Sequence, residues 1–190
     1  MDRRTFLQTT AAAASSAFLA AQASANPAPT PAVRLAPLKV RRSAERGSAD
    51  HGWLKAKFSF SFAGYRDRRF MGFRDLRVLN EDRISGGGGF PMHGHQEMEI
   101  LTYVLDGALE HRDSLGNGGI IKPGLVQRMS AGTGIRHSEF NPSRTKTTHL
   151  MQIWIHPRVR RARPGYAEKQ IAAPDPRQPI QLIASPTGSG

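Results

Sequence analysis

Two pairs of metal-ligating residues, each with one residue between its members, constrain the fold of this chain more than any other feature. His93 and His95 form the first pair, and His137 and Glu139 form the second roughly forty residues later. Residues two apart on a β-strand share a face, because successive side chains point to opposite sides. Two strands that each carry such a pair can direct four ligands at one point. Three imidazoles and one carboxylate are a normal ligand set for a divalent transition metal. The sequence therefore predicts a small β-domain built around one metal ion.

Short apolar runs separated by turn residues indicate that the rest of the chain is also built from strands. The sequence contains 19 Gly and 13 Pro, which suits a turn-rich all-β protein better than a helical one. No helical periodicity longer than about two turns is present. Strands of roughly five to eight residues, with turns about every ten residues, predict an all-β barrel or jelly roll. The expected strands include 58–62, 76–80, 99–105, 108–113, 126–130 and 149–155.

The lack of cysteine and the excess of basic residues narrow the classes of site and partner. Without cysteine, disulfides, thiolate zinc sites and cysteine nucleophiles are excluded, so a metal must be held by nitrogen and oxygen ligands. The formal net charge of +12 favours anionic partners in general. The basic residues are scattered, apart from a group between Arg158 and Arg163, and no nucleic-acid-binding motif stands out. We therefore expect no specific nucleic-acid partner.

Residues 1–25 have the pattern of an export signal. Arg3 and Arg4 precede an Ala-rich apolar run, and a small-x-small cleavage site follows at 23–25. Paired arginines before Phe-Leu resemble the twin-arginine signal, while an ordinary Sec signal and an amphipathic N-terminal helix are the alternatives. The apolar run is too short to span a membrane, so no transmembrane segment is expected in the mature chain. We expect a periplasmic or secreted protein in which 26–37 form a Pro/Ala-rich linker.

Three glutamates compete for the position of the carboxylate ligand. If the first His pair faces inward and its strand continues, every second residue through Leu105 also faces inward, including Glu97 and Glu99. Glu99 lies four residues beyond the pair, about 13 Å along an ideal strand, which is too far to share one ion. Glu97 lies in a polar stretch that is expected to turn. Glu139 is therefore the preferred ligand.

The predicted ligand set leaves one or two open positions on a five- or six-coordinate ion. An open site beside a hydrophobic cavity suits Lewis-acid or O₂ chemistry. Fe(II) fits these donors best, with copper, nickel, manganese and zinc as alternatives. The other four histidines lack a matching partner and are interpreted as surface or hydrogen-bonding residues, and His111 is the best candidate to support a ligand from behind.

Several stretches around these ligands together resemble the pirin family of the cupin superfamily. They are His93-Gly-His95, residues 99–107 (EILTYVLDG), residues 110–117 (EHRDSLGN) and residues 129–139 (MSAGTGIRHSE). The likeness covers roughly residues 38–185. It implies a bicupin whose N-terminal jelly-roll barrel binds iron or a similar metal through His93, His95, His137 and Glu139. Some pirins are described as quercetin 2,3-dioxygenases, and others act as redox-sensitive regulators of transcription factors.

The resemblance also predicts how the chain divides into domains. Residues 38–157 correspond to the N-terminal cupin domain. Residues 158–190 correspond to a basic, Pro-rich connection and the start of a second barrel, with one strand near 180–184. Most of that second barrel is expected to be missing, and a homodimer would cover the apolar surface or strand edge that its absence exposes.

Three functions of different classes are consistent with these patterns. The first is an exported, iron-dependent dioxygenase that acts with O₂ on a flavonol such as quercetin or a related small aromatic. In that enzyme Glu139 would be the catalytic base that removes the substrate's hydroxyl proton. The second is a non-catalytic metal-binding module that serves as a redox sensor or binds a partner, and the third is an inactive fragment. Oxygen uptake by the metal-loaded protein distinguishes the first from the others.

Overall fold

The computed structural model describes residues 39–172, 175–177 and 180–185 of the chain. Within them, the regular structure consists of eleven β-strands and one short 3-10 helix, η1 (Ser43–Glu45). The predicted export signal at 1–25 and the predicted linker at 26–37 lie outside the described residues. A search of the described part of the chain finds no helix with the length and apolar character needed to cross a membrane. The all-β prediction is confirmed for the described residues.

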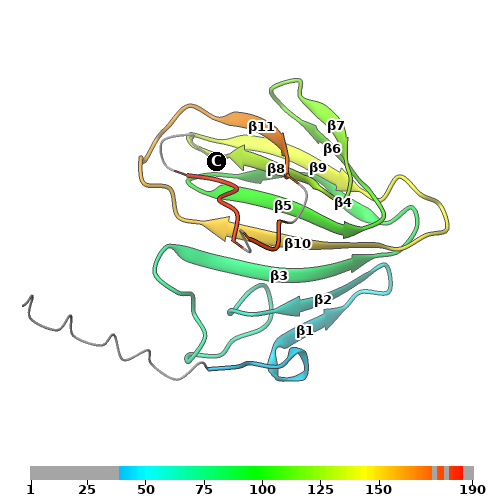
Figure 1. Ribbon diagram of the computed structural model, residues 1–190, viewed down its shortest axis with the longest axis vertical. Coiled ribbons are helices and arrows are strands. Elements are labelled where there is room, and N and C mark those ends of the chain that lie inside the picture. The colour runs from blue at the N-terminus through cyan, green and yellow to red at the C-terminus, as the bar shows by residue number, and fades with distance from the viewer. Residues whose placement is uncertain (1–38, 173–174, 178–179, 186–190) are drawn as a thin grey trace, which may run out of the picture. The chain divides into compact units, whose positions relative to one another are not determined.

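The strands form two antiparallel sheets (Figure 1). The larger sheet has seven strands, in the spatial order β1 (Gly47–Asp50), β2 (Leu54–Phe58), β3 (Leu76–Ile84), β10 (Thr148–Ile155), β5 (Glu99–Asp106), β8 (Leu125–Ser130) and β11 (Gly165–Gln170). The smaller sheet has four strands, in the order β4 (Gly89–His95), β9 (Ile135–Phe140), β6 (Leu109–Asp113) and β7 (Gly118–Ile121). The chain therefore crosses between the sheets several times, as in a jelly roll.

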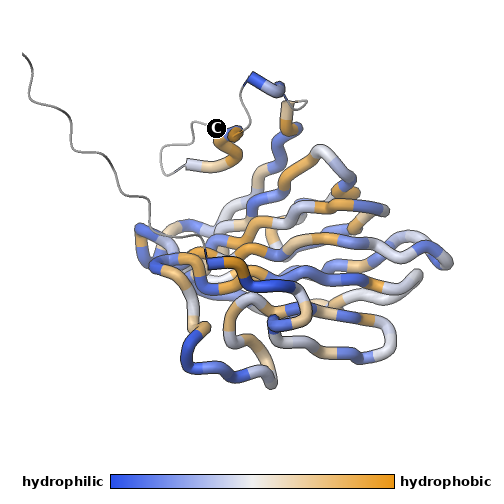
Figure 2. The backbone as a smooth tube through the Cα atoms, turned by 60° about the horizontal axis from the view of Figure 1, so that its bottom comes forward, coloured by the Kyte–Doolittle hydropathy of each residue, from blue (hydrophilic) through white to orange (hydrophobic). Residues whose placement is uncertain are grey.

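Alternating burial explains why these segments form sheets. On β2, for example, Leu54, Ala56 and Phe58 are buried. Lys55 between them is exposed and Lys57 is half-buried. Figure 2 shows hydrophobic and hydrophilic positions alternating along the strands. Each strand thus gives one face to the core and the other to water, which is the pattern typical of antiparallel sheets.

The buried residues between the two sheets form three layers. The first apolar cluster contains Leu54, Ala56, Phe58, Ile84, Val104, Leu109, Ile121 and Leu150. The second apolar cluster contains Ile100, Met129, Ala131 and Ile135. Along the strands between these clusters lies a polar layer of buried residues: Thr102, Gln127 and Gln152 from the larger sheet, and His111, His137 and Glu139 from the smaller one. On β5, successive inward residues pass from the second cluster (Ile100) through the polar layer (Thr102) to the first cluster (Val104).

Most of the predicted strands are confirmed, with ends that differ by a few residues. The expected strands at 99–105, 126–130 and 149–155 correspond to β5, β8 and β10. The strand expected at 76–80 is β3, which continues to Ile84. Turn residues therefore predict the strand starts well. The length of β3 was underestimated because its last residues are polar.

Two details of the prediction differ from the structure. The strand predicted at 58–62 is wrong, because β2 ends where this run begins. Phe62 instead bridges to Tyr65 in a turn. The Ser61 hydroxyl accepts a hydrogen bond from the Asp67 amide at 2.8 Å, a local bond that replaces strand pairing. The described residues 180–185 form no strand, whereas the expected connection contains β11, which pairs with β8.

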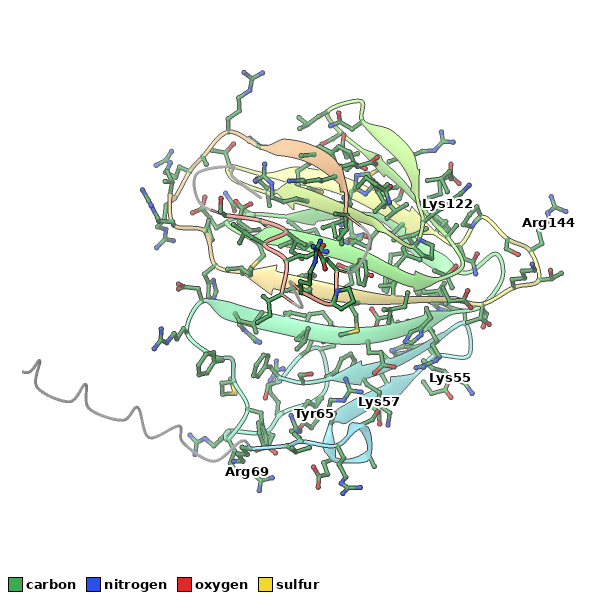
Figure 3. The ribbon with its side chains drawn as sticks, in the orientation of Figure 1. Lys55, Lys57, Tyr65, Arg69, Lys122 and Arg144 are labelled. Carbon is green, nitrogen blue, oxygen red and sulfur yellow. The ribbon has the colours of Figure 1, made fainter. Side chains whose placement is uncertain are left out.

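The loop between β2 and β3 is fixed by aromatic and basic side chains. Figure 3 shows Tyr65 and Arg69 in this loop. The Tyr65 ring lies 6.5 Å from the Phe58 ring, and its hydroxyl accepts a hydrogen bond from Arg41 at 2.9 Å. These contacts attach the loop to the first apolar cluster.

Glu81 on β3 joins three segments of the larger sheet. Its carboxylate forms an ion pair with Arg46, which lies just before β1, and accepts a hydrogen bond from Arg83 at 2.9 Å. His149 on β10 lies 3.0 Å away on the other side. The Arg46 guanidinium, helped by Arg83 and His149, lowers the pKa of Glu81 to about 2. Its side chain is only 17% exposed, so these contacts are poorly screened by water.

The substitution Glu81→Gln should lower the free energy of unfolding by about 2 kcal/mol at pH 7. Because the pKa of Glu81 is depressed from 4.5 to about 2 on folding, the stabilisation is fully present above pH 4.5 and is lost as the pH falls toward 2. Urea denaturation over this pH range measures the effect. Glu110→Gln, which removes an exposed pair with Arg112, is the matched control and should cost less than about 0.5 kcal/mol. Equal effects of the two substitutions would contradict the assignment.

Candidate metal centre

Two neighbouring strands of the smaller sheet each present a pair of ligating residues to the same face. β4 carries His93 and His95, and β9 carries His137 and Glu139. In the antiparallel register, His93 lies directly opposite His137. Residues directly opposite each other on paired strands share a face and lie close together. The two pairs recognised in the sequence therefore meet on the inner face of this sheet.

The three imidazoles converge. The ring centroids of His93 and His137 are 4.4 Å apart, and those of His95 lie 4.8 Å from His93 and 4.9 Å from His137. One nitrogen of each ring lies within 4.8 Å of a nitrogen of the other two. A register shift in β4 between Phe90 and His93 adjusts the strand just before the pair. Three nitrogens in this arrangement can face one ion.

Glu139 is buried beside His137 but belongs to a second group of ligand atoms. Its carboxylate lies within 4.8 Å of nitrogens of His137 and His111. The Gln152 amide donates hydrogen bonds to both carboxylate oxygens, at 2.9 and 3.0 Å, and the Thr102 hydroxyl lies 3.4 Å from one of them. The four predicted ligands thus form two groups that share His137, and the larger sheet holds the Glu139 carboxylate from the opposite side.

The hydrogen bonds of the imidazoles leave Nε2 of each ring free to bind a metal. His93 Nδ1 lies 2.8 Å from the Pro91 carbonyl, which can only accept, so Nδ1 carries the proton and Nε2 keeps its lone pair. His95 Nε2 and His137 Nε2 are buried and have no hydrogen-bond partner. Buried polar atoms without partners are costly, and a cation at this point would satisfy them. The donor set therefore fits a divalent transition metal.

Burial sets the charge of the site. It lowers the pKa of His137 to about 2 and that of His95 to about 4, so both rings are neutral, the form that binds a metal. Burial raises the pKa of Glu139 to about 7, although the hydrogen bonds from Gln152 and Thr102 oppose this shift. The protein alone therefore holds a carboxyl that can gain or lose a proton near neutral pH.

The rival carboxylates form contacts outside the site. The predicted alternation of inward and outward residues from His93 to Leu105 is wrong. The predicted inward face would include Glu99 and Leu105, yet Leu105 is 43% exposed. Glu99 accepts hydrogen bonds from Ser130 at 2.6 Å and Arg128 at 3.2 Å. The alternation does not continue past the first His pair, because Glu97 adopts a left-handed conformation (φ 53°) in the turn between β4 and β5. These two strands belong to different sheets. Glu139 remains the carboxylate beside the histidines.

Asp113, the partner of His111, was missed from the sequence. His111 and Asp113 on β6 are also separated by one residue, and they lie opposite Glu139 and His137 on β9. The sequence predicts that His111 supports a ligand, but it is interpreted there as lacking a matching partner. The His-x-Asp spacing was the available signal. Gln152, by contrast, has no sequence signal, since it reaches the site only through the packing of the two sheets.

Aromatic side chains pack beside two of the histidines. The Trp154 ring lies 4.8 Å from the His95 ring, and the Phe90 ring lies 6.2 Å from the His93 ring. Trp53 packs edge-on against Phe90 at 5.1 Å. His93 and His95 are half-buried, whereas the ligands deeper in the layer are buried. The site is therefore least covered at the His93 and His95 end, where these aromatic rings pack beside the two histidines.

Comparison with known proteins agrees with this geometry. The sequence profile of the family described as Pirin matches residues 38–155. A relative from Escherichia coli K12 named quercetin 2,3-dioxygenase is 52% identical over 147 residues, which cover 77% of this chain and 62% of the relative. A relative from Caulobacter vibrioides named pirin-like protein is 49% identical over 139 residues, covering 73% and 60%. The chain thus spans less than two thirds of the length of these relatives.

Solved structures show the same fold. The crystal structure of the bacterial pirin YhhW from Escherichia coli, described in complex with nickel(II), matches with a TM-score of 0.69 and 53% identity over 71% of this chain and 58% of that one. A quercetin 2,3-dioxygenase from Acinetobacter baumannii matches with a TM-score of 0.53 and 27% identity over 65% and 42%. These likenesses confirm the predicted all-β cupin fold.

The substitution His95→Ala should weaken nickel(II) binding by more than about 100-fold, because even a residue that only supports a ligand contributes about 10–100-fold. Glu99→Ala should bind nickel like the parent protein, since Glu99 is paired with Ser130 and Arg128. His156→Ala removes an exposed histidine and controls for the loss of any imidazole. Chelator competition measures the affinities. If Glu99→Ala lost the metal as completely as His95→Ala, the assignment of the carboxylate would be wrong.

Proposed function

Because the chain belongs to the pirin family, we propose that it is a metal-dependent dioxygenase of flavonols or similar aromatic compounds. The observation that carries this proposal is the convergence of three imidazoles, two with buried nitrogens that have no hydrogen-bond partner, beside aromatic rings. Relatives named quercetin 2,3-dioxygenase support the reaction class. The alternative, a non-catalytic metal-binding module, needs the same ligands but no aromatic rings beside them.

His93, His95 and His137 would hold the ion, and Glu139 is placed to act beside it. Fe(II) is the proposed metal, and the description of a related pirin with nickel(II) supports a divalent transition metal in general. When bound, such an ion would supply Lewis acidity for the oxygens of the substrate and redox chemistry with O₂. The remaining tasks, which are orientation, exclusion of water and proton transfer, fall to the side chains of this chain.

Glu139 has the environment of a catalytic base. Burial raises its pKa to about 7, so it can take a proton from a phenolic hydroxyl at neutral pH. Gln152 donates to both of its oxygens and fixes its orientation. The carboxyl is 4% exposed, so the proton that it accepts is shielded from bulk water.

The aromatic rings beside the histidines can orient a flat substrate. The rings of Trp154 and Phe90 flank the two half-buried histidines, and such rings favour stacked or edge-on contacts with aromatic ligands. Trp154 also has a buried Nε1–H without a hydrogen-bond acceptor. A substrate oxygen would satisfy this donor, which would select for polyhydroxylated aromatics over hydrocarbons.

Iron-loaded protein should consume O₂ when mixed with quercetin, while the absorbance of the flavonol falls. Glu139→Gln should reduce the turnover number about 100-fold or more, as expected for loss of a general base. Glu110→Gln replaces a glutamate outside the site and should keep the parent rate. Metal analysis of each variant separates loss of the base from loss of the ion. No oxygen uptake by fully loaded parent protein with any flavonol would sink the dioxygenase proposal and favour the non-catalytic module.

We also propose that the chain is exported by the twin-arginine pathway, on the evidence of Arg3, Arg4 and the small-residue cleavage site. Changing both arginines to lysine should leave the full-length protein in the cytoplasm. The unchanged chain should be recovered outside the cytoplasm, beginning at Asn26. Cell fractionation with N-terminal sequencing tests both expectations. Recovery of uncut parent protein in the cytoplasm alone would contradict export.

A further inference from the structure

His111 and Asp113 lie directly behind the metal centre and have no role in the function proposed above. His111 is completely buried. Its Nδ1 lies 3.5 Å from Nδ1 of His137, at the limit of a hydrogen bond. Its Nε2 lies 3.6 Å from the Asp113 carboxylate, just beyond hydrogen-bond length, and has no other partner. The three residues therefore form a line that leads from a buried carboxylate to a predicted ligand.

The carboxylate decides which nitrogen of His111 carries the proton. A lone pair on Nε2 would face the negative Asp113 oxygen, which is repulsive, whereas an Nε2–H is attracted to it. His111 therefore carries its proton on Nε2, and its Nδ1 accepts. The Gln127 amide also lies 3.3 Å from this Nδ1 and can donate to it, so it competes with His137 for the single lone pair of that nitrogen. Asp113 therefore decides the tautomer of His111.

The tautomer of His111 in turn decides that of His137. Two bare Nδ1 lone pairs 3.5 Å apart would repel each other, so His137 must carry its proton on Nδ1 and donate it to His111. In a neutral imidazole, the other nitrogen, Nε2, then keeps its lone pair. Nε2 of His137 is buried and has no hydrogen-bond partner.

We propose that Asp113 and His111 act as a relay that fixes the tautomer of His137 and keeps its Nε2 available to the metal. The proposal rests on the function proposed above for His137 as a ligand. A carboxylate behind a metal-binding histidine raises the basicity of the ligand and fixes its orientation. Here a second imidazole transmits that effect. His111 and Asp113 are thus positioning residues that need not touch the ion.

Both ends of the relay are held rigidly. Asp113 Oδ1 accepts hydrogen bonds from the amides of Leu115 at 2.9 Å and Asn117 at 3.0 Å. The Asn117 side chain donates to Oδ2 at 2.9 Å. At the other end, the Tyr166 ring stacks on His111 at 4.9 Å with an interplanar angle of 25°. Tyr166 belongs to β11, beyond the residues 38–155 that match the family profile, so the strand after the matched region closes the back of the site.

A matched pair of substitutions separates the hydrogen bond from simple packing. His111→Leu has a similar volume but no acceptor for the His137 Nδ1–H, whereas the side-chain oxygen of His111→Gln can accept it. Nickel(II) affinity, measured by chelator competition on the full chain, should fall about 10–100-fold in His111→Leu. It should stay within about threefold of the parent in His111→Gln. His156→Leu, at an exposed position, should bind like the parent. Equal loss in the two His111 variants, or no loss in either, would overturn the relay.

A second measurement needs no metal and reads the tautomers in the parent protein itself. Nitrogen NMR of the metal-free parent, labelled at histidine and assigned with His137→Gln, reports the protonated nitrogen of each ring. The relay requires a proton on Nδ1 of His137 and on Nε2 of His111. The opposite tautomer at either ring would contradict it. If the parent protein failed to bind nickel while showing these tautomers, the proposed metal function would fail and the relay geometry would stand.

Discussion

The fold depends on how a buried layer of polar atoms is satisfied between two apolar clusters. Transfer of imidazole nitrogens and a carboxylate into a protein core is costly unless each finds a partner. In the polar layer, Gln152 satisfies the Glu139 carboxylate, while Nε2 of His137, like Nε2 of the neighbouring His95, has no hydrogen-bond partner. An ion that binds these nitrogens would contribute stability as well as chemistry, because it would bind the folded chain and not the unfolded one. The apolar clusters on either side keep this layer dry and rigid.

Much of this arrangement follows from local rules. The spacing of His93 and His95, and of His137 and Glu139, places each pair on one strand face, and the structure sets two of the histidines directly opposite each other. Turn residues such as Asp106-Gly107 mark the strand ends, since Gly107 has a positive φ of 80° there. The motifs that resemble pirins supplied the family, which the sequence profile confirms for residues 38–155.

The remainder depends on contacts between segments that no local pattern reveals. The prediction that Glu99 faces the same side as the first His pair is wrong, because β4 and β5 belong to different sheets with a left-handed residue between them. Gln152 and Thr102 hold Glu139 across the gap between the sheets, so neither has a recognisable spacing to the ligands. His111 was suspected as a support, but its partner Asp113 becomes meaningful only in the register of β6 against β9. Sheet pairing and packing, rather than composition, decide these roles.

X-ray absorption spectroscopy of the metal-loaded full chain tests the central claim most directly. The account predicts one ion per chain with three imidazole nitrogens in its first shell at about 2.0–2.2 Å, and loss of one imidazole from that shell in His137→Gln. A first shell built only from oxygen, or a shell that keeps all its imidazoles in His137→Gln, would contradict the claim that the paired strands β4 and β9 create the metal site.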